Sequence, residues 1–454
     1  MTIAKYYLIC LCFIFFLSCK NDETPDPGPD QDPEVILIDS PEEITGGSFA
    51  IINVNVVPMT ADRVLENHMV LIENNVISGL GIQGTISIPD GMEVIDADGK
   101  GYLIPGLMDM HYHRSTGLDL FLFAANGVTT VREMWGSTGL VALRDRILAE
   151  NLDAPQVFVA SPGMNGANGA FEQFTPPVIT VEEARELVRQ YKAEGFDFIK
   201  AYNKLEPEVY EAIITEAALQ DIPVVGHVPR LVGPRRVFQS GQTSTEHFIG
   251  FGLYASSQGT MSRGTLNAER VDELIDLSLN NGNLWHVPTI MVDVLSTADV
   301  TRIKASPEYQ VISQVLRDNF ESGFAQGTTT SVESEINHKQ VLKAIFDKGG
   351  KIMLGTDAGF GFVIPGYSIH EELNYTVEAG LGNYEALKTA TVNPATYLKV
   401  IDNVGTIEVG KRADLVLLES NPLENIGATK DRAGVVLRGK WISEQAIRDF
   451  LAGG

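Results

Sequence analysis

The chain has 454 residues, of which 44% are hydrophobic and 20% are charged, and it carries a formal net charge of −25. This length allows a large core or several domains, and α/β barrels commonly use about 250 residues or more as one unit. So acidic a chain is unsuited to nucleic acid or to an anionic membrane surface, because binding to phosphate groups requires clustered Lys and Arg.

Residues 1–18 are expected to be a lipoprotein signal peptide. Lys5 precedes an apolar stretch from Tyr6 to Leu17, which is too short for a comfortable membrane span and has the length of a signal-peptide core. The sequence Phe16-Leu17-Ser18-Cys19 resembles a bacterial lipobox, with Cys19 as the lipidated first residue of the mature chain. We therefore expect a protein of the cell envelope that meets the outer or cell membrane through its lipid anchor only. A plain signal peptide or anchor is the alternative.

The residues after the signal are expected to lack a fold of their own. Residues 19–47 are acidic and rich in proline, and they have too little apolar surface to offset the entropy of ordering, so we expect a disordered tether. Cys10 and Cys12 would leave with the signal peptide. Neither a disulfide nor a cysteine-bound metal is therefore expected.

Both ends of the remaining chain contain strand patterns. We expect residues 48–103 and 402–454 to pair into one composite β-sandwich domain. The predicted strands are Phe49 to Val57, Met69 to Ile77 broken by Asn74-Asn75, Met92 to Ile104, Ala413 to Leu418 and Gly434 to Ile442.

Residues 104–401 alternate between strand and helix patterns, which predicts an α/β fold with a (β/α)8 TIM-type barrel. The clearest helix follows Thr180, which forms a capping box with Glu183 and is stopped by Gly195. The eight expected strands are Leu107 to His113, Val128 to Met134, Gln156 to Ser161, Phe196 to Tyr202, Pro223 to Val228, Ser244 to Phe248, Val287 to Val292 and Ile352 to Asp357.

Polar side chains at the ends of these strands predict a metal site. His111 and His113 lie two apart on one strand and therefore face the same way, so both imidazoles can bind one ion. In barrels of this kind functional groups lie at the carboxyl ends of the strands. A single such histidine would more often be structural, but the whole set occupies matching places: His111, His113, Lys200, His227, His247 and Asp357.

Lys200 requires a separate argument, because a protonated lysine beside cations would be repelled. Its strand has apolar residues on both sides, so Lys200 points inward from a dry segment. A desolvated lysine can lose its proton, react with carbon dioxide and become a carbamate that bridges two metal ions. The alternative is a lysine at the surface or in an ion pair.

These motifs together resemble the amidohydrolase superfamily, and most closely its branch of imidazolonepropionases and metal-dependent prolidases. The resemblance extends from about residue 48 to 445. The motifs that carry it are residues 105–113, 127–132, 198–200, 226–228, 246–247, 355–358 and 405–416.

The resemblance implies a two-metal site, usually zinc. His111, His113 and Asp357 would bind one ion, and His227 and His247 would bind the other, with carboxylated Lys200 between them. A hydroxide that bridges the ions would attack the substrate, and Asp357 would act as general base, pass the proton to the leaving group and so serve as the catalytic residue. Manganese, cobalt or iron would also suit these ligands.

The expected activity is hydrolysis of carbon–nitrogen bonds in a small molecule, either amides or cyclic amides, with dipeptides that end in proline among the candidates. Lactone or ester hydrolysis and deamination on the same site are alternatives, and a catalytically inactive surface-binding lipoprotein is another. The sequence does not decide between a monomer and an oligomer. The residues expected to contact substrate are Tyr202, Arg114, Arg230 and His370, the last with a helix-capping role as its alternative.

Three further histidines are expected to be structural or exposed. His286 opens the seventh predicted strand at its amino end, away from the predicted site, which favours a structural role. His338 lies among charged residues of a predicted helix and His68 lies in the predicted sandwich, so both are expected at the surface.

Overall fold

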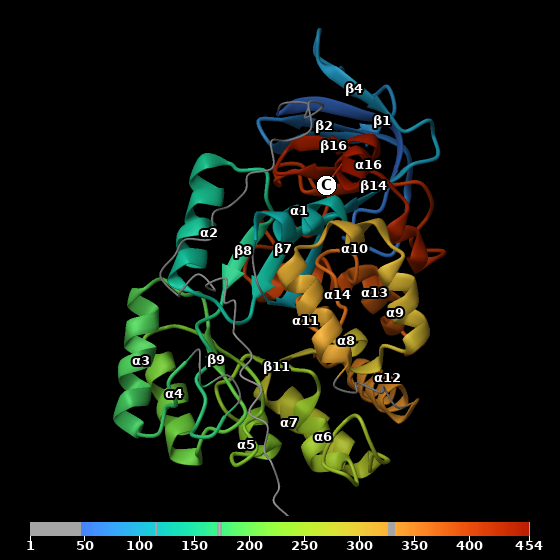
Figure 1. Cartoon of the computed structure of the whole chain (residues 1–454). Coiled ribbons are helices and arrows are strands. Elements are labelled where there is room, and N and C mark those ends of the chain that lie inside the picture. Colours follow the sequence, from blue (N-terminus) through green and yellow to red (C-terminus); the bar gives the residue numbers. More distant parts are fainter. Residues whose placement is uncertain (1–46, 114–115, 170–171, 173–174, 326–331, 454) are drawn as a thin grey trace, which may run out of the picture.

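The computed structural model describes residues 47–113, 116–169, 172, 175–325 and 332–453. The predicted signal peptide, nearly all of the predicted tether, Cys19 and Arg114 lie outside the described residues. The rest is an α/β structure with a sheet at one end and a larger helical body below it (Figure 1). No helix in the described part of the chain combines the length and the apolar character that a membrane crossing requires.

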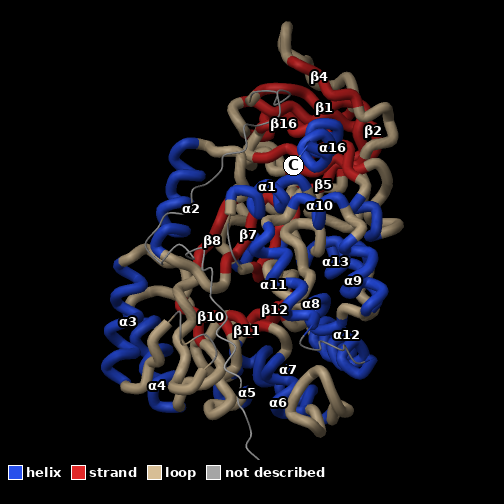
Figure 2. The backbone as a smooth tube through the Cα atoms, viewed as in Figure 1, coloured by secondary structure: helices blue, strands red, loops and turns tan. Residues whose placement is uncertain are grey.

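Strands from the two ends of the chain share one sheet, which we call the outer sheet (Figure 2). Its order is β16-β15-β14-β5-β1-β2-β3, and β4 pairs with β1 beside β5. The first and last parts of the chain meet where β14 runs antiparallel to β5, with Leu417 opposite Leu103. Its strands are β1 (Ser48–Val56), β2 (Leu65–Glu73), β3 (Val76–Ile82), β4 (Glu93–Asp96), β5 (Tyr102–Pro105), β14 (Leu415–Leu418), β15 (Arg432–Leu437) and β16 (Lys440–Ser443).

Alternation along β14 explains how the outer sheet attaches to the rest of the molecule. Leu415 and Leu417 belong to the sheet's own apolar core, whereas Val416 and Leu418 belong to the large core below it. Successive strand residues point to opposite faces, so one short strand serves two cores. The backbone N–H of Ile77 also donates to the carbonyl of Lys411, which joins β3 to the segment before β14. The expected pairing of the two ends is thus observed, and the two-layer sandwich stays a prediction.

Eight short parallel strands form the centre of the larger body in the described part of the chain, the number expected. The eighth was wrong over most of its length, since it was expected from Ile352 to Asp357 and spans only Lys351–Ile352. They hydrogen-bond as β6-β7-β8, β9-β10 and β11-β12-β13. Further backbone hydrogen bonds connect these groups, from Ser161 to Phe198, from Thr243 to Val224 and from Met110 to Leu354. The arrangement is a TIM-barrel-like α/β fold. The strands are β6 (Leu107–Tyr112), β7 (Val128–Glu133), β8 (Gln156–Val159), β9 (Ile199–Ala201), β10 (Val224–Gly226), β11 (Ser244–Glu246), β12 (Trp285–Val287) and β13 (Lys351–Ile352).

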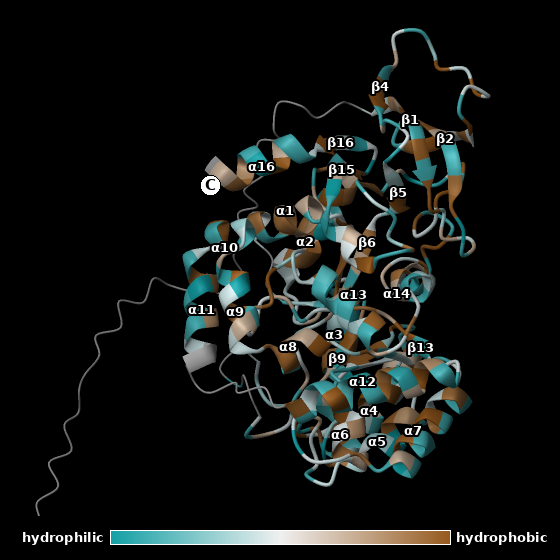
Figure 3. Cartoon of the chain, turned by 90° about the vertical axis from the view of Figure 1, so that its right-hand side faces the viewer, coloured by the Kyte–Doolittle hydropathy of each residue, from teal (hydrophilic) through white to brown (hydrophobic). Residues whose placement is uncertain are grey.

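Helices surround these strands, and Figure 3 shows hydrophilic and hydrophobic residues mixed on them, as expected for helices that bury one face. The predicted capping box is confirmed, because the Thr180 hydroxyl accepts from the Glu183 N–H and the Glu183 carboxylate accepts from the Thr180 N–H. The helices are α1 (Gly117–Ala125), α2 (Thr138–Glu150), α3 (Val181–Ala193), α4 (Pro207–Leu219), α5 (Pro234–Phe238), α6 (Ile249–Ala255), α7 (Ala268–Asn281), α8 (Ile290–Val294), α9 (Thr297–Lys304), α10 (Pro307–Val311), α11 (Gln314–Ala325), α12 (Val332–Asp347), α13 (Ile369–Glu378), α14 (Asn383–Thr389), α15 (Val392–Tyr397), α16 (Glu444–Gly453) and the 3-10 helix η1 (Ile426–Lys430).

The seventh predicted strand was wrong over most of its length. The strand ends at Val287, and the apolar residues after it form α8. Thr289 turns the chain with a left-handed φ of 46°. The Glu372 carboxylate then accepts from the N–H groups of Ile290 and Met291, at 2.7 and 2.8 Å, and so caps the start of the helix. A short apolar run cannot reveal such a distant cap.

Candidate metal centre

The strands bring the six predicted ligands to one end of the strand set. His111 lies in β6 and His113 directly follows it, while Lys200 lies in β9. The remaining three follow the carboxyl ends of their strands: His227 after β10, His247 after β11 and Asp357 after β13. We call these six residues the candidate metal centre.

A His-His-Asp cluster forms the tightest part of the centre. Potential ligand atoms of His111, His113 and Asp357 all lie within 4.8 Å of one another. The Nε2 atoms of the two histidines are 3.2 Å apart, and Asp357 Oδ1 lies 3.3 Å from His111 Nε2 and 3.2 Å from His113 Nε2. Two imidazole nitrogens and a carboxylate oxygen that converge in this way are ligands suited to zinc and similar divalent ions.

The other two histidines stand beside this cluster. The His247 ring centroid is 4.6 Å from that of His111 and 4.9 Å from that of His227. The four predicted histidine ligands therefore form one continuous group. The expectation that residues from five strands meet at one place agrees with this geometry.

Two members of the centre adopt strained backbone conformations. His247 has φ 61° and Asp357 has φ 65°, in the left-handed region that residues with a side chain rarely occupy. Glu246 already points inward from β11, so extended backbone would turn His247 outward. The left-handed turn brings both side chains to the same place. Strain held at such positions is typical of functional sites.

Oxygen atoms fix the orientation of three of the rings. Glu246 Oε2 lies 2.9 Å from His111 Nδ1, Asn203 Oδ1 lies 2.8 Å from His227 Nδ1, and Thr289 Oγ1 lies 2.6 Å from His247 Nδ1. A carboxylate and an amide oxygen only accept, so the first two rings carry their proton on Nδ1. Their Nε2 lone pairs are free for a ligand role. Sequence reasoning gave these three oxygen-bearing residues no such role.

Lys200 is fully buried, and its Nζ has no hydrogen-bond partner among the described residues. Burial lowers the pKa of Lys200 to about 8, although Glu246 and Asp357 act in the opposite direction. An unpaired buried amine costs free energy, so its presence points to a missing partner or to chemical modification. The expectation of an inward, desolvated lysine agrees with this placement.

Charge and burial within the centre favour an anionic Asp357 and neutral rings at His111 and His227. Burial alone would raise the pKa of Asp357, but His247 and His113 outweigh it and hold that pKa below its usual value. Burial, and then Lys200, lowers the pKa of His111 and of His227 well below the ordinary value of histidine. Neutral imidazoles and an ionised carboxylate are the protonation states that bind a metal ion.

Beneath the centre, apolar side chains fill the interior of the strand set. Phe198 and Val225 lie two residues before Lys200 and His227 and pack in one buried cluster with Val287 and Met353. The spacing of two keeps each pair on one side of its strand. This packing separates the polar groups above from the rest of the barrel and gives them a low-dielectric floor.

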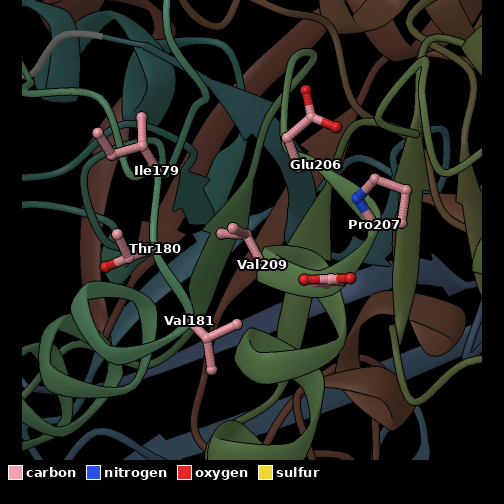
Figure 4. Close-up of a pocket in the computed structure, with 7 residues that line it drawn as sticks. Ile179, Thr180, Val181, Glu206, Pro207 and Val209 are labelled. Carbon is pink, nitrogen blue, oxygen red and sulfur yellow. The ribbon is translucent and has the colours of Figure 1, made fainter.

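A pocket opens beside the centre. Its wall includes His247 and Asp357, the exposed Arg230, Asn203 and Asp293. Aliphatic residues complete the wall: Ile249, Leu253, Met261 and Val292. Another hollow lies at the starts of α3 and α4 (Figure 4), and none of the six predicted ligands lines it.

The residues expected to contact substrate lie in different places. Tyr202 packs against His227, with ring centroids 4.2 Å apart, and Arg230 lies in the pocket wall. His370 is buried on α13 and contacts Thr429 of η1 at 3.0 Å, so its placement gives no support to a substrate role. Arg114 lies outside the described residues.

His338 was wrongly expected at the surface. It is fully buried, its Nδ1 donates to the Ser334 carbonyl at 2.8 Å, and its Nε2 lies 3.3 Å from Asp293 in the pocket wall. Charged sequence neighbours suggested exposure, but α12 packs this face against α8. His286 agrees with a structural role, since it is fully buried between Ser278 and Thr245, although it lies within β12 rather than at its start. His68 is half-buried in β2.

The amidohydrolase family model matches residues 102–442, which cover most of the chain. This chain belongs to the amidohydrolase family. A 5-methylthioadenosine/S-adenosylhomocysteine deaminase from Caldanaerobacter subterraneus subsp. tengcongensis is 24% identical over 405 residues, 82% of this chain and 85% of that protein. An imidazolonepropionase from a Geobacillus species is 22% identical over 392 residues, 79% of this chain and 85% of that protein.

A solved Xaa-Pro dipeptidase with bound methionine shares the fold. It superposes with a TM-score of 0.67 at 23% identity, covering 87% of this chain and all of that one. The resemblance expected from the motifs is thereby confirmed. As an amidohydrolase the protein is an enzyme that acts on carbon–nitrogen bonds, and its family is metal-dependent, which agrees with the His-His-Asp cluster.

Proposed function

We propose that this amidohydrolase cleaves amide or cyclic amide bonds in small molecules that carry a carboxylate, dipeptides first among them, with two divalent ions and with Asp357 as general base. The observation that carries the proposal is the convergence of His111, His113 and Asp357 within 4.8 Å, beside two further histidines. An inert binding protein would have no need for so many inward-facing ligand atoms.

The residues fit a pair of divalent ions. We assign His111, His113 and Asp357 to one ion and His227 and His247 to the other, with zinc as the first candidate. Asp357 Oδ1 has no hydrogen-bond donor among the described residues although it is buried, which supports a cation as its partner. When bound, the two ions would supply an activated water and polarise the scissile carbonyl.

Lys200 is proposed to carry the carbamate that connects the ions. The ammonium group first loses one proton; the neutral amine then adds to the carbon of CO2 and loses a second proton, so a cation becomes an anion with two ligand oxygens. Its lowered pKa makes the neutral amine available near neutral pH, and its unpaired buried Nζ leaves it free to react. The expected presence of two cations then explains why a lysine stands among metal ligands.

Asp357 is proposed to move the proton. Its carboxylate is held ionised by His247 and His113, so it can accept a proton from the attacking water and deliver it to the leaving nitrogen. The position of Asp357 in the pocket wall puts it next to the space where a substrate would lie.

The pocket supports a dipeptide as substrate. Arg230 can bind a carboxylate and Asp293 can bind an ammonium group, and a free dipeptide carries both. Tyr202, which packs on His227, is proposed to contact the substrate from the side of that ring. Deamination is the second candidate, because a matched relative is named as a deaminase. Lactone or ester hydrolysis on the same groups is the third candidate.

Two further proposals concern architecture and location. We infer that β6 to β13 close into a full (β/α)8 barrel flanked by a sandwich built from both chain ends, which the hydrogen bond from Met110 to Leu354 supports. We also propose that the protein is attached to the cell envelope through a lipid on Cys19. Replacement of Cys19 by Ser should release it from the membrane fraction.

The test is a hydrolysis screen of purified protein. A library of dipeptides, N-acyl amino acids, lactones and aminopurines is incubated with zinc-loaded protein and with chelator-treated protein. We expect cleavage of dipeptides or N-acyl amino acids that zinc restores after chelation. Activity on aminopurines alone would favour deamination, and no activity on any class would refute the proposal.

A further inference from the structure

Glu246 directly precedes His247 in the chain, but it contacts a different histidine. Its Oε2 lies 2.9 Å from His111 Nδ1, and both side chains are fully buried. Because an ionised carboxylate only accepts, His111 holds its proton on Nδ1. The Nε2 lone pair of His111 then faces His113 and Asp357.

Arg132 holds Glu246 in turn. Its Nη2 donates to both carboxylate oxygens, at 3.1 and 3.2 Å, and the Ser244 hydroxyl donates to Oε1 at 2.5 Å. The pair is fully buried, and the guanidinium lies over the Phe198 and Tyr397 rings, 5.7 and 5.5 Å from their centroids. A carboxylate fixed by two cationic contacts and a hydroxyl has little freedom to move.

Arg132 also contacts the backbone that carries His111. Its Nε donates to the carbonyl of Met110 at 2.7 Å. The chain of contacts thus connects β7, β11 and β6 and returns to the strand from which His111 projects. Both the ring and the backbone of His111 are therefore fixed by one buried ion pair.

The other histidines of the centre have weaker partners. The Nδ1 atoms of His227 and His247 contact neutral oxygens, from an amide and a hydroxyl. His113 Nδ1 lies 3.9 Å from the Glu133 carboxylate, which is beyond hydrogen-bond distance. Among these four rings His111 alone has a carboxylate within hydrogen-bond distance of its Nδ1, on the side of the ring that faces away from Asp357. A carboxylate increases the basicity of a metal-binding imidazole more than a neutral oxygen does.

We propose that Glu246, held by Arg132, is a positioning residue that fixes the ring and proton of His111 and so sets the affinity of the ion that His111, His113 and Asp357 bind. The inference rests on the proposed function, since it presupposes a divalent ion at this place. Glu246 would thus orient a ligand of one ion, whereas His247, the next residue in the chain, would bind the other ion directly.

The test measures zinc affinity rather than activity. Metal-free full-length protein is titrated with zinc in competition with a fluorescent chelator, for wild type and Glu246→Gln. Glutamine keeps an acceptor for His111 but loses the charge, so we expect zinc affinity to fall in part. Loss of such partners typically weakens metal binding by about 10- to 100-fold.

A double variant, Arg132→Met with Glu246→Leu, guards against a folding defect, because Glu246→Leu alone would leave Arg132 buried and unpaired. It removes both charges of the pair, so neither is left unpaired. We expect one ion to bind about 10- to 100-fold more weakly and the other to bind with wild-type affinity. Its cobalt-loaded form should also show an altered visible spectrum. The matched control is Glu216→Gln, which removes a buried carboxylate paired with Arg189 on helices away from the centre and should leave zinc affinity unchanged.

The outcomes separate this inference from the proposed function. Wild-type protein that binds two zinc ions, together with unchanged affinity in folded Glu246→Gln and in the double variant, would overturn the positioning role alone. Wild-type protein that binds no zinc would overturn the proposed function and this inference with it. The role of Glu246 would be established if the affinity for one zinc ion fell in Glu246→Gln and fell further in the double variant, while the affinity for the other ion stayed unchanged.

Discussion

Replacement of Lys200 by Met should stabilise the metal-free protein and remove part of its pH dependence. Burial lowers the pKa of Lys200 from 10.5 to about 8, and the group is fully buried, so solvent does not screen the effect. Near pH 7 both the folded and the unfolded chain hold the proton, and the folded chain keeps it at a cost of about 3 kcal/mol. Methionine has a similar length and no charge, so the Lys200→Met variant avoids this cost.

The sign of the pH dependence follows from the same shift. Between pH 8 and 10.5 the folded protein has lost this proton while the unfolded chain still binds it, so stability rises with pH in that window. From pH 7 to 9 the contribution of Lys200 amounts to about 1 kcal/mol. Other groups titrate too, but they are common to both proteins, so the difference between wild type and Lys200→Met isolates this lysine.

The assay is urea unfolding of chelator-treated protein in buffers free of CO2, at pH 7, 8 and 9. The variant should be more stable than wild type at pH 7, and the gap should narrow by about 1 kcal/mol at pH 9. Lys204→Met is the control, because Lys204 is largely exposed on the loop that follows β9. Equal stability of wild type and Lys200→Met at every pH would refute the view that Lys200 is a desolvated, unpaired amine.

Three further changes test the proposed chemistry. Lys200→Ala should leave a folded protein with one ion or none and little activity, and propionate should restore part of both by entering the space between the ions; a fully loaded, active variant would exclude the carbamate. Asp357→Asn should keep the fold and much of the metal yet lose about a hundredfold or more in turnover, the scale of general-base catalysis; near-normal turnover would remove Asp357 from that role. Arg230→Ala should raise KM for substrates with a free carboxylate and leave KM for their amides unchanged, and equal effects on both would exclude carboxylate binding.

The principal ligands could be predicted from the sequence because their positions follow from local rules. Spacing of two places His111 and His113 on one side of a strand, and polar residues at the ends of apolar runs marked His227, His247 and Asp357. To make these predictions it is enough to know where each strand lies in the sequence and in which direction it runs. The structure brings all of these residues to one place.

The contacts between strands could not be predicted in the same way. Glu246 and His111 are 135 positions apart, and Asn203 and Thr289 act on rings of other strands. Which oxygen meets which ring depends on the exact register around the barrel and on the left-handed turn at His247. His338 shows the same limit, since its burial depends on the packing of α12 against α8 rather than on its charged neighbours.

The most direct test of the two-metal site is elemental analysis of the protein produced with added zinc and bicarbonate. Six ligands that include a carbamate exceed what one tetrahedral ion needs, so we predict about two zinc ions per chain. One ion or fewer under these conditions would contradict the bridging role of Lys200 and the two-metal account.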